Sequence, residues 1–199
     1  MASTRLQILG LSLAVFGWIG AIVCCALPIW KFTEGKVVTV QAIWEGLWMT
    51  CVVDNTGNMV CDIHDSILDV PQDIQVARAL TIIVIILGIL GIFAAAIGGK
   101  CTNCVEDKNT KAKICIVAGI IFLISGILLL IPVSWTANSI VRDFHNSEKT
   151  DLNKKEPGAS LFIGWAGAAL LLIGGALLCC NCPKKDVSFS ARYNTNNQL

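Results

Sequence analysis

Four long stretches without a charged side chain constrain this sequence more than any other feature. They cover residues 6–30, 79–99, 114–141 and 157–183, and none contains Asp, Glu, Lys or Arg. A helix needs about 20 residues to cross the roughly 30 Å of hydrocarbon in a bilayer, and every stretch reaches that length. With 55% hydrophobic and 15% charged residues, the chain is too apolar for an ordinary soluble domain. The sequence therefore predicts a membrane protein with four helical spans.

We expect residues 1–199 to form a single domain with two loops on one side of the membrane. The first stretch is interpreted as a retained helix and not as a signal peptide, because Pro28 and Trp30 follow it in place of a small-residue cleavage motif. The expected segments are spans at about 7–28, 79–99, 114–136 and 160–180, outer loops at about 29–78 and 137–159, an inner loop at 100–113 and a tail at 181–199.

The basic residues indicate which segments face the cytoplasm. Four spans place both termini on the same side as residues 100–113. Eight Lys and Arg residues lie in these short segments near span ends, whereas seven are spread over the two outer loops. Positive charge is enriched in short cytoplasmic segments, so we expect both termini to be cytoplasmic.

The segment 45–65, EGLWMTCVVDNTGNMVCDIHD, contains a predicted β-hairpin. The runs LWMTCVV and MVCDIH are rich in Val, Met and Trp, and DNTGN between them is rich in turn-forming residues. If Val53 pairs with Met59, Cys51 lies directly opposite Cys61. We expect a disulfide between these two cysteines, the only ones in the outer loops, and two free thiols are the alternative. The run KVVTVQAIW, residues 36–44, predicts a third strand.

The spans carry further signals at their ends and along their faces. The third span is expected to continue as a helix past Trp135, because SWTANSIVRDFHN keeps helical spacing. Trp30, Trp135 and Trp165 lie near span ends, where aromatic rings favour the membrane interface. Small residues at four-residue spacing predict close helix packing. These are Gly91, Ala95 and Gly99 in the second span and Gly164 and Ala168 in the fourth.

Together these features resemble the claudin family of tight junctions. The resemblance rests on a tryptophan before the first outer loop, a GLW motif and two cysteines within that loop, and an arginine just before the second span. It extends over roughly residues 1–183, including GGKCTNC and GASLFIGWAGAALLLIGGALLCCNCP. The motif residues are Trp30, Gly46, Leu47, Trp48, Cys51, Cys61 and Arg78.

The claudin resemblance implies a fold and a function. The fold would be a left-handed bundle of four transmembrane helices topped by an antiparallel sheet of about five strands, four from the first outer loop and one from the second. The protein would lie in the plasma membrane at tight junctions, in contact with lipid and with claudin-like protomers in cis and in trans. It would form a paracellular barrier or charge-selective channel, with no enzymatic activity and no cofactor. The disulfide-linked hairpin would line the passage.

The first outer loop supplies candidate ion-selectivity residues. Residues 31–78 carry seven acidic and three basic side chains, which favours cations. Asp62 directly follows the second cysteine, a position that resembles a pore-lining site of claudins. We therefore predict that Asp62, Asp65 and Glu45 select ions, and the competing interpretation is that Asp62 is a solvated strand residue.

Five cysteines lie at the expected cytoplasmic ends of the second and fourth spans. Their spacing permits a zinc site, and unmodified thiols are another interpretation. The claudin resemblance implies palmitoylation, which is common for cysteines beside a membrane, and no metal is expected. The candidates are Cys101, Cys104, Cys179, Cys180 and Cys182.

Three features depart from the usual claudin pattern. KFTEGKVV is shorter than the corresponding claudin stretch and lacks its apolar tip, which bears on side-by-side assembly. The second outer loop has His145 and Ser147 where claudins commonly have Tyr and Pro, which argues against enterotoxin binding and against adhesion through this loop. The chain ends in NNQL in place of Tyr-Val, so it is an atypical ligand for cytoplasmic PDZ scaffolds.

Other function classes fit the sequence less well. His64 and His145 are expected to be solvated loop residues, so no catalytic constellation is visible. A net charge of +1 without a basic aromatic patch gives no argument for nucleic acid. A thiol-redox enzyme using Cys101 and Cys104 would need them on the other side of the membrane, and tetraspanins and connexins place their cysteines differently. The alternatives left open are the related myelin and epithelial membrane proteins and a claudin that forms no strands.

Overall fold

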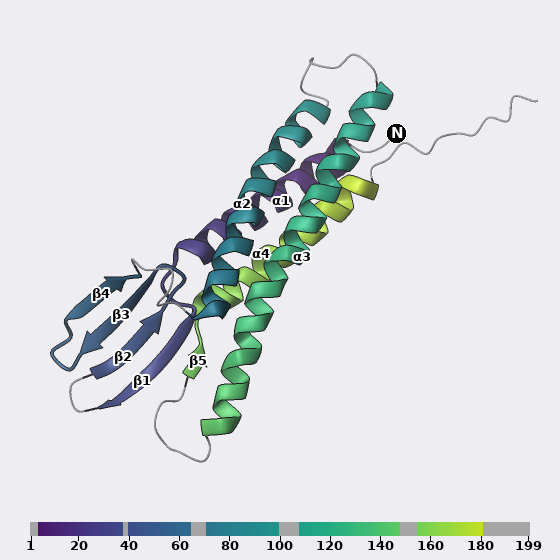
Figure 1. Ribbon diagram of the computed structural model, residues 1–199. Coiled ribbons are helices and arrows are strands. Elements are labelled where there is room, and N and C mark those ends of the chain that lie inside the picture. Colours follow the sequence, from purple (N-terminus) through teal and green to yellow (C-terminus); the bar gives the residue numbers. More distant parts are fainter. Residues whose placement is uncertain (1–3, 38–39, 65–70, 100–107, 148–154, 181–199) are drawn as a thin grey trace, which may run out of the picture.

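The computed structural model describes residues 4–37, 40–64, 71–99, 108–147 and 155–180. Figure 1 shows a bundle of four long helices with a five-stranded sheet at one end. The predicted fold class is confirmed. The helices are α1 (Thr4–Ala26), α2 (Gln72–Gly98), α3 (Lys108–Ser147) and α4 (Ala159–Cys180), and the strands are β1 (Lys31–Val37), β2 (Val40–Glu45), β3 (Met49–Asp54), β4 (Met59–Ile63) and β5 (Lys155–Pro157).

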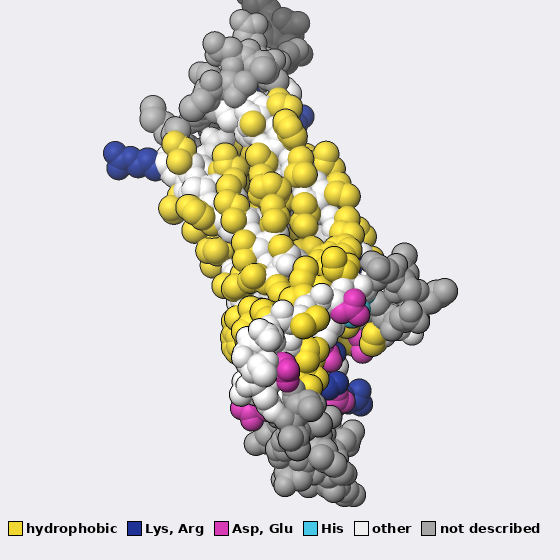
Figure 2. Space-filling model, turned by 90° about the vertical axis from the view of Figure 1, so that its left-hand side faces the viewer, with side chains coloured by type: hydrophobic (Ala, Val, Ile, Leu, Met, Phe, Trp, Pro, Cys, Tyr) yellow, Lys and Arg dark blue, Asp and Glu magenta, His cyan; other side chains and the backbone are white. Residues whose placement is uncertain are grey.

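All four helices are long and apolar enough to cross a membrane. Figure 2 shows their hydrophobic side chains covering the middle of the molecule, while acidic side chains gather around the sheet. Large apolar side chains on the outside of the bundle, such as Phe16, Phe93 and Ile127, are more than half exposed. Such side chains are suited to contact with lipid.

Two helices extend beyond the expected spans. α2 begins at Gln72, where the sequence analysis expected the outer loop to continue to residue 78. α3 has 40 residues, so it is about 60 Å long at 1.5 Å per residue, twice the thickness of the hydrocarbon core. Its predicted continuation past Trp135 is confirmed. The extension reaches β5, where Lys155 Nζ lies 3.7 Å from Asp143 Oδ2.

α1 and α4 pack through glycines that leave no room for a side chain. A Cβ added at Gly17 would lie 2.7 Å from the carbonyl oxygen of Gly167, and one added at Gly174 would lie 2.6 Å from that of Gly10. Both distances are shorter than a Cβ tolerates. The two backbones therefore touch directly, as small residues allow in membrane helices.

The small residues predicted from the second and fourth spans also lie at helix contacts. A Cβ at Gly91 would meet the Phe122 ring at 2.9 Å, and one at Gly164 would meet Val133 Cγ2 at 2.7 Å. Gly99 differs, because it caps the end of α2 and does not lie within the helix. Small residues thus bring α2 and α4 close to α3.

The sheet is antiparallel, with strand order β4-β3-β2-β1-β5. β3 and β4 pair in the predicted register, with Val53 opposite Met59 and Cys51 opposite Cys61. The connection between these strands turns at Gly57, whose φ of 80° suits glycine. The hairpin prediction is therefore confirmed.

The predicted single strand over residues 36–44 is wrong. Its first two residues belong to β1 and its last five to β2, and Val37 pairs with Val40 where the chain folds back. Apolar alternation has the same period in one long strand and in two short strands joined by a tight connection. The folded-back arrangement lets Phe32 pack edge to face on Trp44, with ring centroids 6.0 Å apart.

Candidate functional site

Gly46 and Leu47 join the sheet to the helix bundle. A Cβ at Gly46 would lie 2.4 Å from Cα of Pro28, so only glycine fits against the segment that follows α1. Leu47 is 1% exposed and belongs to the hydrophobic core. Trp30 is also buried, and its Nε1 donates to the Cys24 carbonyl oxygen at 2.8 Å. The Trp30 ring therefore packs inside the protein, beside the end of α1.

Arg78, in the second turn of α2, ties this helix to the same connection. Its Nε donates a hydrogen bond to the carbonyl oxygen of Leu47, and its Cζ lies 5.1 Å from the centroid of the Trp48 ring. Arg78 is only 9% exposed, and its Nη2 has no hydrogen-bond partner among the described residues. The motif residues other than the two cysteines thus lie together at the junction of sheet and bundle.

A disulfide joins Cys51 and Cys61 across the β3–β4 hairpin. The two residues are directly opposed, as the predicted register requires. Cys51 is fully buried, whereas Cys61 lies on the exposed strand β4. The bond closes a loop with a sequence separation of 10 residues and fixes the register of β4.

Glu45 and Asp62, two of the three predicted ion-selectivity residues, lie in one row across the sheet. Lys31 pairs with Glu45, Glu45 with Thr50, and Thr50 with Asp62. Directly opposed residues project to the same face, so these four side chains form a cross-strand row. Asp62 is exposed and the other three are half-buried. Asp65 lies outside the described residues.

His64 lies beside this cross-strand row. Its Nε2 is 3.2 Å from Thr50 Oγ1, and its backbone N–H donates to the Trp48 carbonyl oxygen at 3.1 Å. His64 lies directly after β4, outside the strands, and its side chain is half-buried. The contact joins β3 to the residue that follows β4, and it was not predicted because the predicted register ended at the cysteine pair. The side chain of His145 lies outside the described part of the chain.

β4 forms an edge of the sheet. It pairs only with β3 among the described strands, and its side chains Met59, Val60 and Ile63 are 52–67% exposed. An edge strand offers unpaired backbone groups to another chain. The sequence predicts this strand but not its edge position, which depends on the order of strands from both outer loops.

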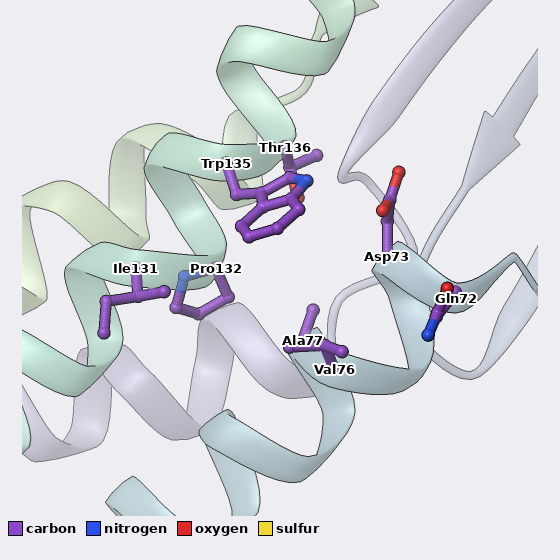
Figure 3. Close-up of a pocket in the computed structure, with 8 residues that line it drawn as sticks. All are labelled: Gln72, Asp73, Val76, Ala77, Ile131, Pro132, Trp135 and Thr136. Atoms are coloured by element: carbon purple, nitrogen blue, oxygen red, sulfur yellow. The ribbon is translucent and has the colours of Figure 1, made fainter.

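An open pocket of about 200 Å³ lies between the start of α2 and the part of α3 around Pro132 (Figure 3). Apolar side chains make up most of its lining, and Asp73 is its one ionisable side chain. An acid–base pair is therefore absent from this lining. The lining residues are Gln72, Asp73, Val76, Ala77, Ile131, Pro132, Trp135 and Thr136.

Two of the cysteine candidates for modification lie at the end of α4, away from the sheet. Cys179 is half-buried and Cys180 is exposed at the end of α4 (Figure 1). Cys101, Cys104 and Cys182 fall outside the described residues. Within the described ranges, no group of three or more His, Cys, Asp or Glu residues is placed to hold a metal ion.

The sequence model of the PMP-22/EMP/MP20/Claudin family matches residues 4–178. Claudin-4 of Canis lupus familiaris is 56% identical over 198 residues, covering 98% of this chain and 94% of the relative. Claudin-like protein ZF-A89 of Danio rerio is 54% identical, covering 98% and 95%. Claudin-3 of Homo sapiens is 53% identical over 192 residues, covering 95% and 87%.

These matches extend over all four helices and the sheet. The motif cluster around Arg78 and the cysteine pair, which carried the resemblance, lie within the matched residues. The chain belongs to the claudin family.

Proposed function

We propose that this protein forms a cation-favouring paracellular channel within tight junctions. As a claudin it is a tight-junction membrane protein with four spans and not an enzyme. The observation that carries the ion preference is the cross-strand row, in which Glu45 and the exposed Asp62 occupy one face of the sheet. This face would line the passage, and Asp65, which lies outside the described residues, stays a predicted selectivity residue.

The electrostatic effect of one carboxylate is large enough to select ions. A unit charge about 5 Å from a passing cation contributes about 1 kcal/mol in water and about 3 kcal/mol at an effective dielectric constant near 20. A difference of about 1.4 kcal/mol changes relative occupancy tenfold. Asp62, exposed on the edge strand, is therefore the principal selectivity residue of the proposal.

The proposed orientation places the sheet outside the cell and both termini in the cytoplasm. A disulfide persists in an oxidising compartment, and the Cys51–Cys61 bond lies in the sheet. α1 begins and α4 ends at the opposite end of the bundle (Figure 1). The basic residues concentrated near those span ends support the same orientation.

The proposed partners outside the cell are other claudin protomers, in cis and in trans. The edge strand β4 offers backbone groups and the exposed side chains of Met59, Val60 and Ile63 for such contacts.

One observation favours a second candidate, a claudin that reaches the membrane but forms no strands. Val37 pairs with Val40, which leaves only two residues between β1 and β2, in agreement with the short KFTEGKVV segment.

On the cytoplasmic side, the proposal includes palmitoylation of the juxtamembrane cysteines. Cys180 is exposed at the end of α4, where an acyl chain would enter the inner leaflet. A PDZ scaffold would have to accept the atypical C-terminal sequence NNQL, whose last residue is Leu199.

Freeze-fracture electron microscopy of contacts between transfected cells that lack tight-junction strands tests the proposed function. The channel proposal predicts continuous strands at those contacts and a higher permeability to sodium than to chloride across a monolayer. Protein that reaches the contacts without forming strands would reject the channel and support the strand-free candidate.

A further inference from the structure

We infer that His64 makes the cation preference of the first outer loop sensitive to acidification, so that protonation of this imidazole weakens the preference for sodium. The inference deepens the proposed function and rests on it. The structure places a titratable ring in contact with Thr50, the cross-strand partner of the carboxylate that is proposed to select ions. Strand pairing and this side-chain contact together bring the ring to the cross-strand row.

Two contacts to β3 and to the connection before it position His64, which directly follows β4. Its backbone N–H donates to the Trp48 carbonyl oxygen, and its side chain meets the Thr50 side chain. Thr50 is the cross-strand partner of Asp62, and its Oγ1 lies 3.2 Å from His64 Nε2. The imidazole is thus held diagonally across the hairpin and beside the cross-strand row.

The hydrogen bond to Thr50 is compatible with both charge states of the ring. A neutral imidazole can accept at Nε2 from the Thr50 hydroxyl, or donate to it, depending on the tautomer. A protonated imidazole donates at Nε2, and the hydroxyl oxygen accepts. Uptake of a proton from solvent therefore changes the charge beside Asp62 without removing the contact that positions the ring.

The charged groups on the elements packed around His64 have both signs. On the cross-strand row, Asp62 and Glu45 are acidic and Lys31 at the far end is basic. On α2, the Arg78 guanidinium lies over the Trp48 ring. The backbone carbonyl oxygen of Trp48 accepts a hydrogen bond from the His64 backbone N–H. Asp65, the next residue in the sequence, lies outside the described residues. A new positive charge at His64 reduces the attraction that the two carboxylates of the row exert on a passing cation.

The test is the ratio of sodium to chloride permeability, obtained from dilution potentials across monolayers at pH 7.4 and at pH 5.5. Imidazole is the side-chain type that changes charge in this window. We expect acidification to lower the wild-type ratio roughly threefold, the effect of a unit charge about 6 Å from the ion path in water. Monolayers without the protein, measured at both pH values, give the background to subtract.

Two substitutions separate the charge of His64 from its packing. His64→Gln keeps a side chain that can hydrogen-bond Thr50 but cannot gain a charge, and its ratio should stay high at both pH values. His64→Lys carries a permanent charge, and its ratio should be low at both. Immunofluorescence at cell contacts is the control that checks whether each variant is present in the same amount as the wild type.

The possible outcomes distinguish this inference from the proposed function. A wild-type ratio that is high and equal at both pH values, or a His64→Gln variant that keeps the full acid response, would overturn the role of His64 and leave the cation channel intact. A wild-type ratio at pH 7.4 that shows no preference for sodium would contradict the proposed function and this inference together.

Discussion

The Arg78 guanidinium donates a hydrogen bond from Nε to the carbonyl oxygen of Leu47, 31 residues earlier in the chain. Arg78 belongs to α2 and Leu47 to the connection between β2 and β3, so the contact joins a membrane helix to the sheet. The Trp48 ring covers the guanidinium from one side. The position of the hairpin that carries Asp62 therefore depends on this buried cation.

Replacing Arg78 by Met should destabilise the protein without changing its membrane insertion. The substitution removes a hydrogen bond to a charged group and a cation–π contact, worth together about 2 to 4 kcal/mol. Thermal unfolding in detergent, followed by fluorescence-detected gel filtration, should show a melting temperature several degrees lower. Arg142→Met is the matched control, because Arg142 is exposed on α3. Equal melting temperatures for the two variants would refute the structural role of Arg78.

Adding one methyl group should destabilise the protein to different extents at two glycines of α1. Gly17→Ala places a Cβ 2.7 Å from the Gly167 carbonyl oxygen and 2.8 Å from the Leu171 nitrogen. Gly20→Ala meets its first neighbour, the Gly167 Cα, only at 3.3 Å. Overpacking costs about 1 to 3 kcal/mol, so Gly17→Ala should lower the melting temperature in detergent clearly more than Gly20→Ala does. Similar values for both would show that α1 and α4 do not pack as described.

The Cys51–Cys61 bond should stabilise the hairpin mainly by restricting the unfolded chain. Closing a loop with a sequence separation of 10 residues is worth about 2.8 kcal/mol in the chain-entropy model. The double variant Cys51→Ala with Cys61→Ala should be cleaved by protease between β3 and β4 much faster than the wild type. Cys180→Ala, at the end of α4, is the control and should leave the cleavage rate unchanged. A hairpin that stays resistant without the bond would contradict this prediction.

The sequence predicted the elements whose signal is local. Each helix overlaps one of the four stretches without charges. The hairpin register followed from turn residues and from one assumed pair, Val53 with Met59. The division of residues 36–44 between two strands was missed, because alternation does not show where a chain folds back.

Features of the site that depend on long-range contacts were harder to predict from the sequence. Asp62 and Glu45 were chosen one by one for their charge, and only the pairing of three strands shows that they share a row with Thr50. The contact between His64 and Thr50 and the burial of Trp30 under the sheet depend in the same way on tertiary structure. The motif around Arg78 was found through resemblance, and its physical role became visible only in the contacts to Leu47 and Trp48.

The charge of Asp62 and the face of the sheet that it occupies decide the proposed selectivity, so Asp62→Asn is the substitution to measure. Glu34→Gln is the matched control. Glu34 is an exposed acid on β1 that pairs with Ala42, and its odd spacing from Lys31 puts it on the opposite face from the cross-strand row. Both variants remove one negative charge from the same loop, and only one removes it from the proposed ion path.

The measurement is the ratio of sodium to chloride permeability across monolayers expressing the wild type, Asp62→Asn or Glu34→Gln at pH 7.4. We predict a sodium preference in the wild type, a roughly fivefold lower ratio for Asp62→Asn, from the loss of about 1 kcal/mol, and little change for Glu34→Gln. A wild type without sodium preference, or equal effects of the two substitutions, would contradict a channel lined by the face that carries Asp62.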